Sequence, residues 1–109
     1  GGAGNISPDD YVARLSEGWE PFLLDVRRPD EEAIVSLPGT ELRVQHDEIL
    51  LHLEQIPKDR DVVVYCRTGQ RSMMVAFALK QSGYTRDILN LAGGVHAWSD
   101  LVDSAVPKY

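Results

Sequence analysis

Three apolar runs along the chain have the pattern of buried strands. They cover residues 22–26, 62–66 and 88–91, and most of their positions are apolar. A strand that is apolar on both of its faces is typical of a parallel sheet with helices on each side. A fourth, more polar strand is expected at residues 41–44, after a turn at 37–40.

Segments with capping residues or helical spacing separate these runs. Ser7 and Pro8 begin the first helix, as its N-cap and its first helical residue, and Gly18 ends it. Its apolar side chains are expected to face inward. A short helical turn is expected at residues 30–34, and apolar residues at helical spacing predict a further helix at 47–55. The inward candidates of the first helix are Tyr11, Val12 and Leu15.

Two more helices are expected in the second half of the chain. Ser72 is the expected N-cap of a helix that runs to Gln81. The residues of this helix are apolar almost all round, which predicts burial on every side. A glycine turn at Gly93 and Gly94 precedes the last helix, which is expected at residues 95–101.

The alternation of strands and helices predicts the α/β class, with a small parallel β-sheet flanked by helices on both faces. A chain of 109 residues has the length of one domain with one modest core. We expect this domain to span residues 7–109. The glycine-rich residues 1–6 are expected to be a linker or a cloning remnant. Because the chain does not begin with methionine, we expect it to be excised from a longer protein.

Composition and charge narrow the classes of function. The chain is 43% hydrophobic and 26% charged, and its net charge of −6 argues against general binding to nucleic acids or membrane surfaces. Its one cysteine excludes an internal disulfide and a metal site made of several thiolates. No apolar run is long enough to cross a bilayer. We therefore expect a cytoplasmic protein, and no metal or other cofactor is expected.

The only cysteine lies where the second apolar run ends and the long helix begins. It opens a short polar loop, Cys66-Arg67-Thr68-Gly69-Gln70-Arg71-Ser72. The loop N–H groups, the positive end of the following helix and the arginines together attract an anion, so the cysteine is expected to be largely thiolate. A lone cysteine is otherwise most often a small buried hydrophobic residue. The polar, cationic residues that follow Cys66 favour a reactive one.

Asp25 marks a second strand end. The carboxyl ends of parallel strands share one edge of a sheet, where ligands bind, so Asp25 and the nearby Arg27 are expected beside Cys66. A carboxylate at the end of a buried strand usually accepts hydrogen bonds from loop N–H groups or an arginine, and we expect this structural role for Asp25. The three histidines show no spacing typical of a metal site. A solvated face is expected for the acidic run Asp30-Glu31-Glu32.

The loop at residues 66–72 resembles the active-site loop of the rhodanese family of sulfurtransferases. Three further segments resemble signatures of this family in the same order along the chain, at residues 24–27, 37–40 and 91–98. The tail at residues 98–109 resembles the end of the rhodanese module that is fused to ubiquitin-activating-type adenylyltransferases in molybdopterin, thiamine and thiolation pathways.

The chain departs from the family pattern in one region. Val35-Ser36 stands where a Gly-His pair is common, and residues 43–46 are more polar than usual. Both differences lie away from the loop in sequence. They affect the expected local backbone and any partner surface there, and not the chemistry of Cys66.

The resemblance implies that Cys66 takes a sulfane sulfur from a donor such as thiosulfate or a protein persulfide. The resulting Cys66 persulfide then gives the sulfur to a nucleophilic acceptor. The resemblance also implies a ubiquitin-like sulfur carrier as one acceptor, and an adenylyltransferase domain before residue 1. The thiolate and the persulfide are both anions, which backbone N–H groups of residues 67–72 and a helix N-terminus can stabilise.

Each member of the loop has an expected role in this chemistry. Arg71 is expected to hold the loop in place against Asp25 or a backbone carbonyl. Arg67 is expected to point outward toward an anionic donor. Thr68 can supply a hydroxyl donor, and Gly69 can adopt a positive φ. The remaining loop residues are expected to contribute backbone N–H groups: Gln70 and Ser72.

The residues leave two alternatives open. Cysteine phosphatases and arsenate reductases with a similar sheet place one residue more between cysteine and arginine than the four that separate Cys66 from Arg71. A tetrahedral phosphate needs the wider loop and a single sulfur fits the narrower one, which favours sulfur transfer. The second alternative is a noncatalytic interaction module with the same fold, although such a module has no chemical need of a thiol.

Overall fold

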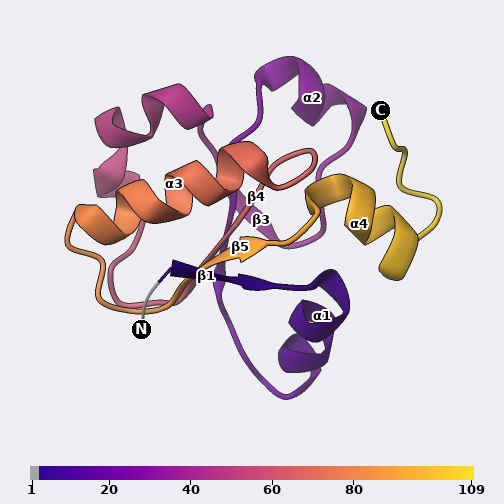
Figure 1. The fold of residues 1–109 in the computed structure, drawn as a ribbon, viewed down its shortest axis with the longest axis horizontal. Coiled ribbons are helices and arrows are strands. Elements are labelled where there is room, and N and C mark those ends of the chain that lie inside the picture. The colour runs from indigo at the N-terminus through magenta and orange to yellow at the C-terminus, as the bar shows by residue number, and fades with distance from the viewer. Residues whose placement is uncertain (1–2) are drawn as a thin grey trace.

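A computed structural model describes residues 3–109, which form a five-stranded parallel β-sheet with helices on both faces (Figure 1). The strand order is β1-β5-β4-β2-β3, and all neighbouring strands are parallel. The predicted α/β fold class is therefore confirmed. The strands are β1 (Ala3–Ile6), β2 (Phe22–Asp25), β3 (Thr40–Arg43), β4 (Val62–Tyr65) and β5 (Ile88–Leu91). The helices are α1 (Pro8–Ser16), α2 (Pro29–Ile34), α3 (Gln70–Gln81) and α4 (Gly94–Leu101), with two 3₁₀ helices, η1 (His46–Leu51) and η2 (Leu53–Gln55).

The central strand β4 contributes to the core on both sides of the sheet. Val62 and Val64 pack with α3 on one side, and Val63 and Tyr65 pack with α1 and α4 on the other. This alternation is that of a pleated strand, and all four side chains are fully buried. Burial of one such side chain contributes about 1.5–3 kcal/mol. The strand is thus held firmly, and the residue after it, Cys66, has a defined place at the edge of the sheet.

Residues 3–6 belong to the sheet, which corrects the expectation of a linker over residues 1–6. As β1 they pair in parallel with β5, and the side chain of Ile6 is 7% exposed. The segment has little strand pattern of its own. It becomes a strand because the edge of β5 offers backbone groups that need hydrogen-bond partners. Residues 1 and 2 lie outside the described residues, so the expectation of a linker or cloning remnant stays a prediction for these two residues.

The helix after the loop begins earlier and is less buried than expected. It starts at Gln70 with Gly69 as its N-cap, so the expectation that Ser72 is the cap is wrong. Ser72 lies inside the first turn, where its hydroxyl is used by the site described below. Met74 is 66% exposed and Phe77 is 57% exposed, because only one face of α3 packs on the sheet.

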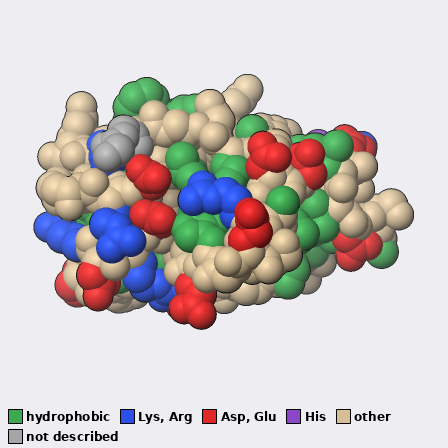
Figure 2. Space-filling view, turned by 90° about the horizontal axis from the view of Figure 1, so that it is seen from below, with side chains coloured by type: hydrophobic (Ala, Val, Ile, Leu, Met, Phe, Trp, Pro, Cys, Tyr) green, Lys and Arg blue, Asp and Glu red, His purple; other side chains and the backbone are tan. Residues whose placement is uncertain are grey.

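Two other expected helices differ in detail. The first is confirmed as α1, but only Tyr11 of its inward candidates is buried, since Val12 and Leu15 are each 38% exposed. The helix expected at 47–55 is formed by the 3₁₀ helices η1 and η2. In the described part of the chain, no helix is long and apolar enough to cross a lipid bilayer. On the face shown in Figure 2, acidic and basic side chains are interspersed.

Deletion of residues 1–6 tests the assignment of β1. We expect the free energy of unfolding to fall by about 2–4 kcal/mol, because the ladder to β5 and the burial of Ile6 are both lost. Urea denaturation measures the change. Deletion of residues 1 and 2 alone is the control and is expected to have little effect. Equal stability of the two deletion variants would show that residues 3–6 act only as a linker.

Candidate active site

Cys66 lies directly after β4, at the start of a loop that curls around its side chain. Its Sγ accepts hydrogen bonds from the backbone N–H of Gly69 at 3.1 Å and of Ser72 at 3.4 Å, and the residue is 1% exposed. Gly69 has a φ of 100°, as predicted, a backbone conformation that glycine adopts without strain. The N-terminus of α3 therefore faces Sγ with its positive end, a geometry that stabilises an anion.

The start of α4 fixes the same loop from the opposite side. The backbone N–H of Val95 donates to the carbonyl of Cys66 at 3.0 Å, and that of His96 donates to the carbonyl of Arg67 at 3.1 Å. Close approach requires glycine here, since a Cβ on Gly94 would lie 2.3 Å from the carbonyl oxygen of Cys66. The glycine turn between β5 and α4 thus allows one helix terminus to hold the backbone of the cysteine loop.

A chain of polar side chains runs from the sulfur to the edge of the sheet. The hydroxyl of Ser72 lies 3.3 Å from Cys66 Sγ and donates to Asn90 Oδ1 at 2.5 Å. Asn90 Nδ2 in turn donates to Asn5 Oδ1 at 3.0 Å, on β1. Because the single hydroxyl proton of Ser72 points to Asn90, its oxygen can accept a hydrogen bond from Cys66 when the cysteine is protonated. A lone asparagine in an apolar strand has no distinctive spacing, so the sequence alone does not mark Asn90 as a site residue.

Arg71 pairs with Glu31, and the expected pairing with Asp25 or a carbonyl is wrong. Its Nη1 lies 2.6 Å from Glu31 Oε1 and its Nη2 lies 3.0 Å from Oε2. Glu31 is only 3% exposed, so the expectation of a solvated face is wrong for this residue, since α2 turns it toward the loop. The hydrogen bonds from Arg71 lower the pKa of Glu31 to about 2, although burial acts in the opposite direction.

Asp25 and Arg27 form a second ion pair, and both residues are fully buried. Asp25 Oδ1 accepts from the Nε of Arg27 at 2.9 Å, and Oδ2 accepts from Nη2 at 2.8 Å. The guanidinium also donates to the carbonyl of Val35 at 2.6 Å and to that of Glu31 at 3.3 Å. Asp25 therefore partners an arginine, as expected. The departure from the family pattern at Val35 affects this contact little, because any residue supplies a backbone carbonyl.

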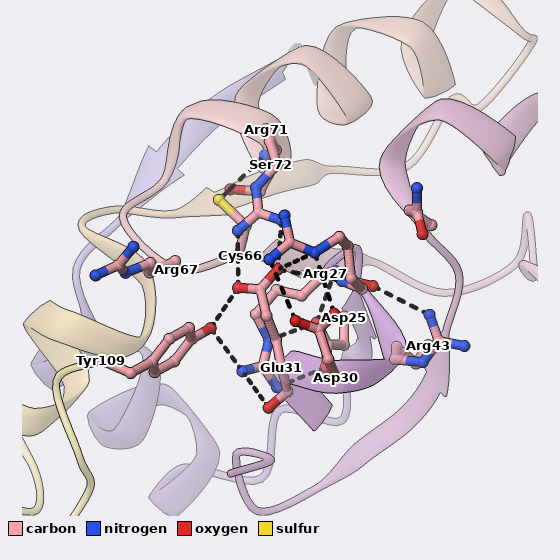
Figure 3. A network of polar contacts seen from close by, with 12 residues as sticks. Asp25, Arg27, Asp30, Glu31, Arg43, Cys66, Arg67, Arg71, Ser72 and Tyr109 are labelled. Carbon is pink, nitrogen blue, oxygen red and sulfur yellow. Dashed lines mark hydrogen bonds and ion pairs between the residues drawn. The ribbon is translucent and has the colours of Figure 1, made fainter. Parts of the chain in front are cut away.

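A tyrosine near the end of the chain joins the two ion pairs. The hydroxyl of Tyr109 donates to Glu31 Oε2 at 2.6 Å and accepts from Arg27 Nη1 at 2.9 Å (Figure 3). Burial and the hydrogen bond to Glu31 raise the pKa of Tyr109 to about 12, so the phenol stays protonated at neutral pH. Tyr109 and Arg27 are 82 positions apart in the sequence, and no local pattern connects them.

The exposed side chains of the loop are those of Arg67, Thr68 and Gln70. Arg67 points outward, as predicted, with its Nε 3.4 Å from the Nε2 of His96. Its guanidinium carbon lies 5.0 Å from the ring centre of Tyr109. The functional roles expected for Thr68 and Gln70 stay predictions.

The chemistry of the site is that of a thiol in an anion-binding loop. Within residues 3–109, no group of three or more His, Cys, Asp or Glu side chains is placed to hold a metal ion. The two buried carboxylates near the loop are already paired with arginines. The groups available to a substrate are therefore the sulfur, the N–H groups around it and the exposed cation at the rim.

Substitution of Glu31 by glutamine tests the ion pair that holds Arg71. The low pKa of Glu31 means that its stabilising effect is complete above its unfolded-state pKa and is lost as the pH falls toward 2. We expect the variant to lose about 3 kcal/mol of unfolding free energy at pH 7. Its stability should then change less than that of the wild type between about pH 5 and pH 2. Urea denaturation at several pH values measures both effects.

The neighbouring Glu32→Gln variant is a matched control. Glu32 pairs with Arg43 at the surface, and its side chain is 48% exposed. We expect its removal to change stability by less than about 0.5 kcal/mol. Equal effects of the two substitutions at pH 7 would contradict the structural role of Glu31.

Comparison with known proteins places this arrangement in a family. The family sequence model for the rhodanese-like domain matches residues 7–101. A sulfurtransferase of Allochromatium vinosum is 40% identical over 94 residues, which cover 86% of each chain. The adenylyltransferase and sulfurtransferase UBA4 of Candida albicans is 33% identical over 112 residues, which cover 95% of this chain and 25% of that protein.

A solved structure shows the same fold. The thiosulfate sulfurtransferase from Pseudomonas aeruginosa superposes with a TM-score of 0.77 at 25% sequence identity, over 90% of this chain and 19% of that one. The chain thus spans about a quarter of the UBA4 relative and most of the Allochromatium one. The family match and these relatives agree with the geometry of the site, in which a glycine turn before α4 lets that helix hold the cysteine loop. The chain belongs to the rhodanese-like family of sulfurtransferases.

Proposed function

We propose that Cys66 carries sulfur as a persulfide. Its thiolate attacks the outer, sulfane sulfur of thiosulfate. A sulfur–sulfur bond forms to Cys66 while the bond within thiosulfate breaks, and sulfite leaves with the electron pair. A nucleophile such as cyanide then attacks the outer sulfur of the persulfide and leaves as thiocyanate, which restores the thiolate. The cycle needs no oxidant or reductant.

The observation that carries the proposal is the set of hydrogen-bond donors around the sulfur. The N–H groups of Gly69 and Ser72 point at Sγ, and the positive end of α3 lies behind them. Fixed donors of this kind stabilise the thiolate and the persulfide without reorganising during the reaction. The exposed Arg67 adds a local cation on a chain with a net charge of −6, which supports attraction of an anionic donor to this edge.

The position of Arg71 supports sulfur transfer over phosphate chemistry. Both ends of its guanidinium fork are used by Glu31, so the fork is not turned toward a ligand at Cys66. The N–H of Gly69 already lies 3.1 Å from Sγ. A loop this narrow suits a single added sulfur better than the three equatorial oxygens of a phosphoryl group.

The proposed acceptor in the cell is a ubiquitin-like sulfur carrier, and the proposed donor there is a protein persulfide in the cytoplasm. The similarity to UBA4, which is named for both adenylyltransferase and sulfurtransferase activity, supports this choice. The chain spans about a quarter of that relative, so an adenylyltransferase domain in the same protein is part of the proposal. A noncatalytic docking module is the competing function.

Replacement of Cys66 by serine separates these functions. We expect transfer from thiosulfate to cyanide to fall by more than about 1,000-fold, because serine cannot form a persulfide. Colorimetric detection of thiocyanate measures the rate, and urea denaturation confirms that the variant is folded. Full transfer by the serine variant would exclude Cys66 as the carrier. A wild-type protein that accepts sulfur from no donor, yet binds a partner equally well with serine at position 66, would support the docking module.

Replacement of Arg67 by leucine tests the origin of donor preference. We expect the KM for thiosulfate to rise by about 10-fold with kcat changed less than about twofold. The substitution removes a charged contact that binds the donor and leaves the groups around the sulfur in place. Arg86→Leu is the control. Arg86 lies before the amino end of β5, whereas Cys66 follows the carboxyl end of β4, and Arg86 pairs with Asp61. An unchanged KM in the Arg67 variant would show that the donor is bound by backbone groups alone.

A further inference from the structure

The hydroxyl of Tyr109 occupies a position that the two buried ion pairs both need. The guanidinium of Arg27 is fully buried and has five N–H donors. Asp25 accepts two of them, the carbonyls of Glu31 and Val35 accept one each, and Tyr109 accepts the fifth. Without the phenol, one buried donor of a charged group has no acceptor from the described side chains, which is strongly unfavourable.

The same hydroxyl links the two ion pairs into one series of hydrogen bonds. Because it accepts from Arg27, its one proton must point to Glu31, which holds Arg71 through both carboxylate oxygens. The series runs from Asp25 through Arg27, the phenol and Glu31 to Arg71 at the loop, with alternating charge (Figure 3). Hydrogen bonds in such a series strengthen one another. Tyr109 therefore belongs to the series of hydrogen bonds that holds Arg71 at the loop.

The ring of Tyr109 has a separate contact with the rim of the site. It lies 5.0 Å from the guanidinium of Arg67 and 6.3 Å, edge to face, from the ring of His96. Among residues 3–109, Arg67 forms no ion pair with a carboxylate, so its charge is available to a ligand. Contacts with a ring and an imidazole restrict the arginine without neutralising it.

The segment that carries Tyr109 packs lightly on the rest of the domain. Most of residues 102–109 are exposed, and Val106 and Tyr109 are the members that pack against the core. The carbonyl of Val106 accepts from the hydroxyl of Ser99 at 2.8 Å, and Lys108 pairs with Asp100 on α4. Tyr109 thus anchors the segment to two buried side chains, Arg27 and Glu31, and both belong to the active site.

We propose that Tyr109 is a positioning residue that sets the preference of Cys66 for anionic donors. It does so in two ways, by holding Arg67 at the rim through its ring and by holding Arg71 through the hydroxyl contact with Glu31. The effect on sulfur donors rests on the persulfide function proposed above. The effect on the electrostatic field at Cys66 Sγ does not depend on that function, and it can be measured separately.

The test compares two alkylating reagents of similar size and different charge. Iodoacetate is an anion and iodoacetamide is neutral, and Cys66 is the only cysteine with which either can react. The ratio of their rate constants, followed by intact mass, reports the positive field at the sulfur. A change of access alone alters both rates and leaves the ratio unchanged.

Two variants separate the hydroxyl from the ring. Tyr109→Phe removes the hydrogen bonds and keeps the ring, and we expect the ratio to fall by about twofold. Tyr109→Leu removes both, and we expect a fall of about fivefold. Tyr84→Phe is the control, because its buried hydroxyl bonds to the carbonyl of Ile56 at 2.6 Å on the α3 side of the sheet, and the ratio should not change. The KM for thiosulfate should rise by at least the factors by which the ratio falls, because thiosulfate carries two negative charges and iodoacetate one, with kcat changed less than about twofold.

A wild-type ratio in both Tyr109 variants would overturn the proposal, as would a lowered ratio with an unchanged KM for thiosulfate. If Tyr109→Leu fails to fold, the phenylalanine variant still gives the hydroxyl contribution. Failure of the wild type to accept sulfur from thiosulfate would overturn the proposed function. The alkylation ratio would still decide whether Tyr109 shapes the field at Cys66.

Discussion

A buried sulfur faced by backbone N–H groups is the feature on which the rest of this structure depends. Cys66 follows the central strand β4, and the loop after it folds back so that the N–H groups of Gly69 and Ser72 donate to its Sγ. In a flexible loop these two N–H groups would form hydrogen bonds with water and not with the sulfur. The loop stays closed because α3 begins within it and α4 donates two hydrogen bonds to its carbonyls. The glycine turn before α4 makes that approach possible.

The charged side chains form a second layer around this loop. Asp25 and Arg27 are fully buried, Glu31 is nearly so, and each has hydrogen-bond partners that compensate for its loss of water. Arg71 is held at the loop by this layer, and Arg67 forms no ion pair with a carboxylate of residues 3–109 at the rim. An acidic protein can in this way place an exposed cation on the loop that holds its cysteine. The layer depends on contacts between α2, the cysteine loop and the last residues of the chain.

The parts of the site that could be predicted from the sequence are those with a local cause. The apolar pattern predicted β4, and the polar residues after Cys66 predicted a reactive loop with Gly69 at a positive φ. Partners that meet only through folding could not be predicted. Glu31 sits in a helix of six residues, which is too short to show an inward face, and Tyr109 approaches Arg27 from 82 positions away. The strand β1 likewise forms only because β5 offers an edge.

The most direct measurement of the central claim uses thiosulfate labelled in its outer sulfur. After excess reagent is removed, the protein is digested and the peptide that contains Cys66 is analysed by mass spectrometry. The account predicts one labelled sulfur on Cys66, which cyanide removes as labelled thiocyanate. A peptide that carries no labelled sulfur, or one that carries a label that cyanide does not release, would contradict it.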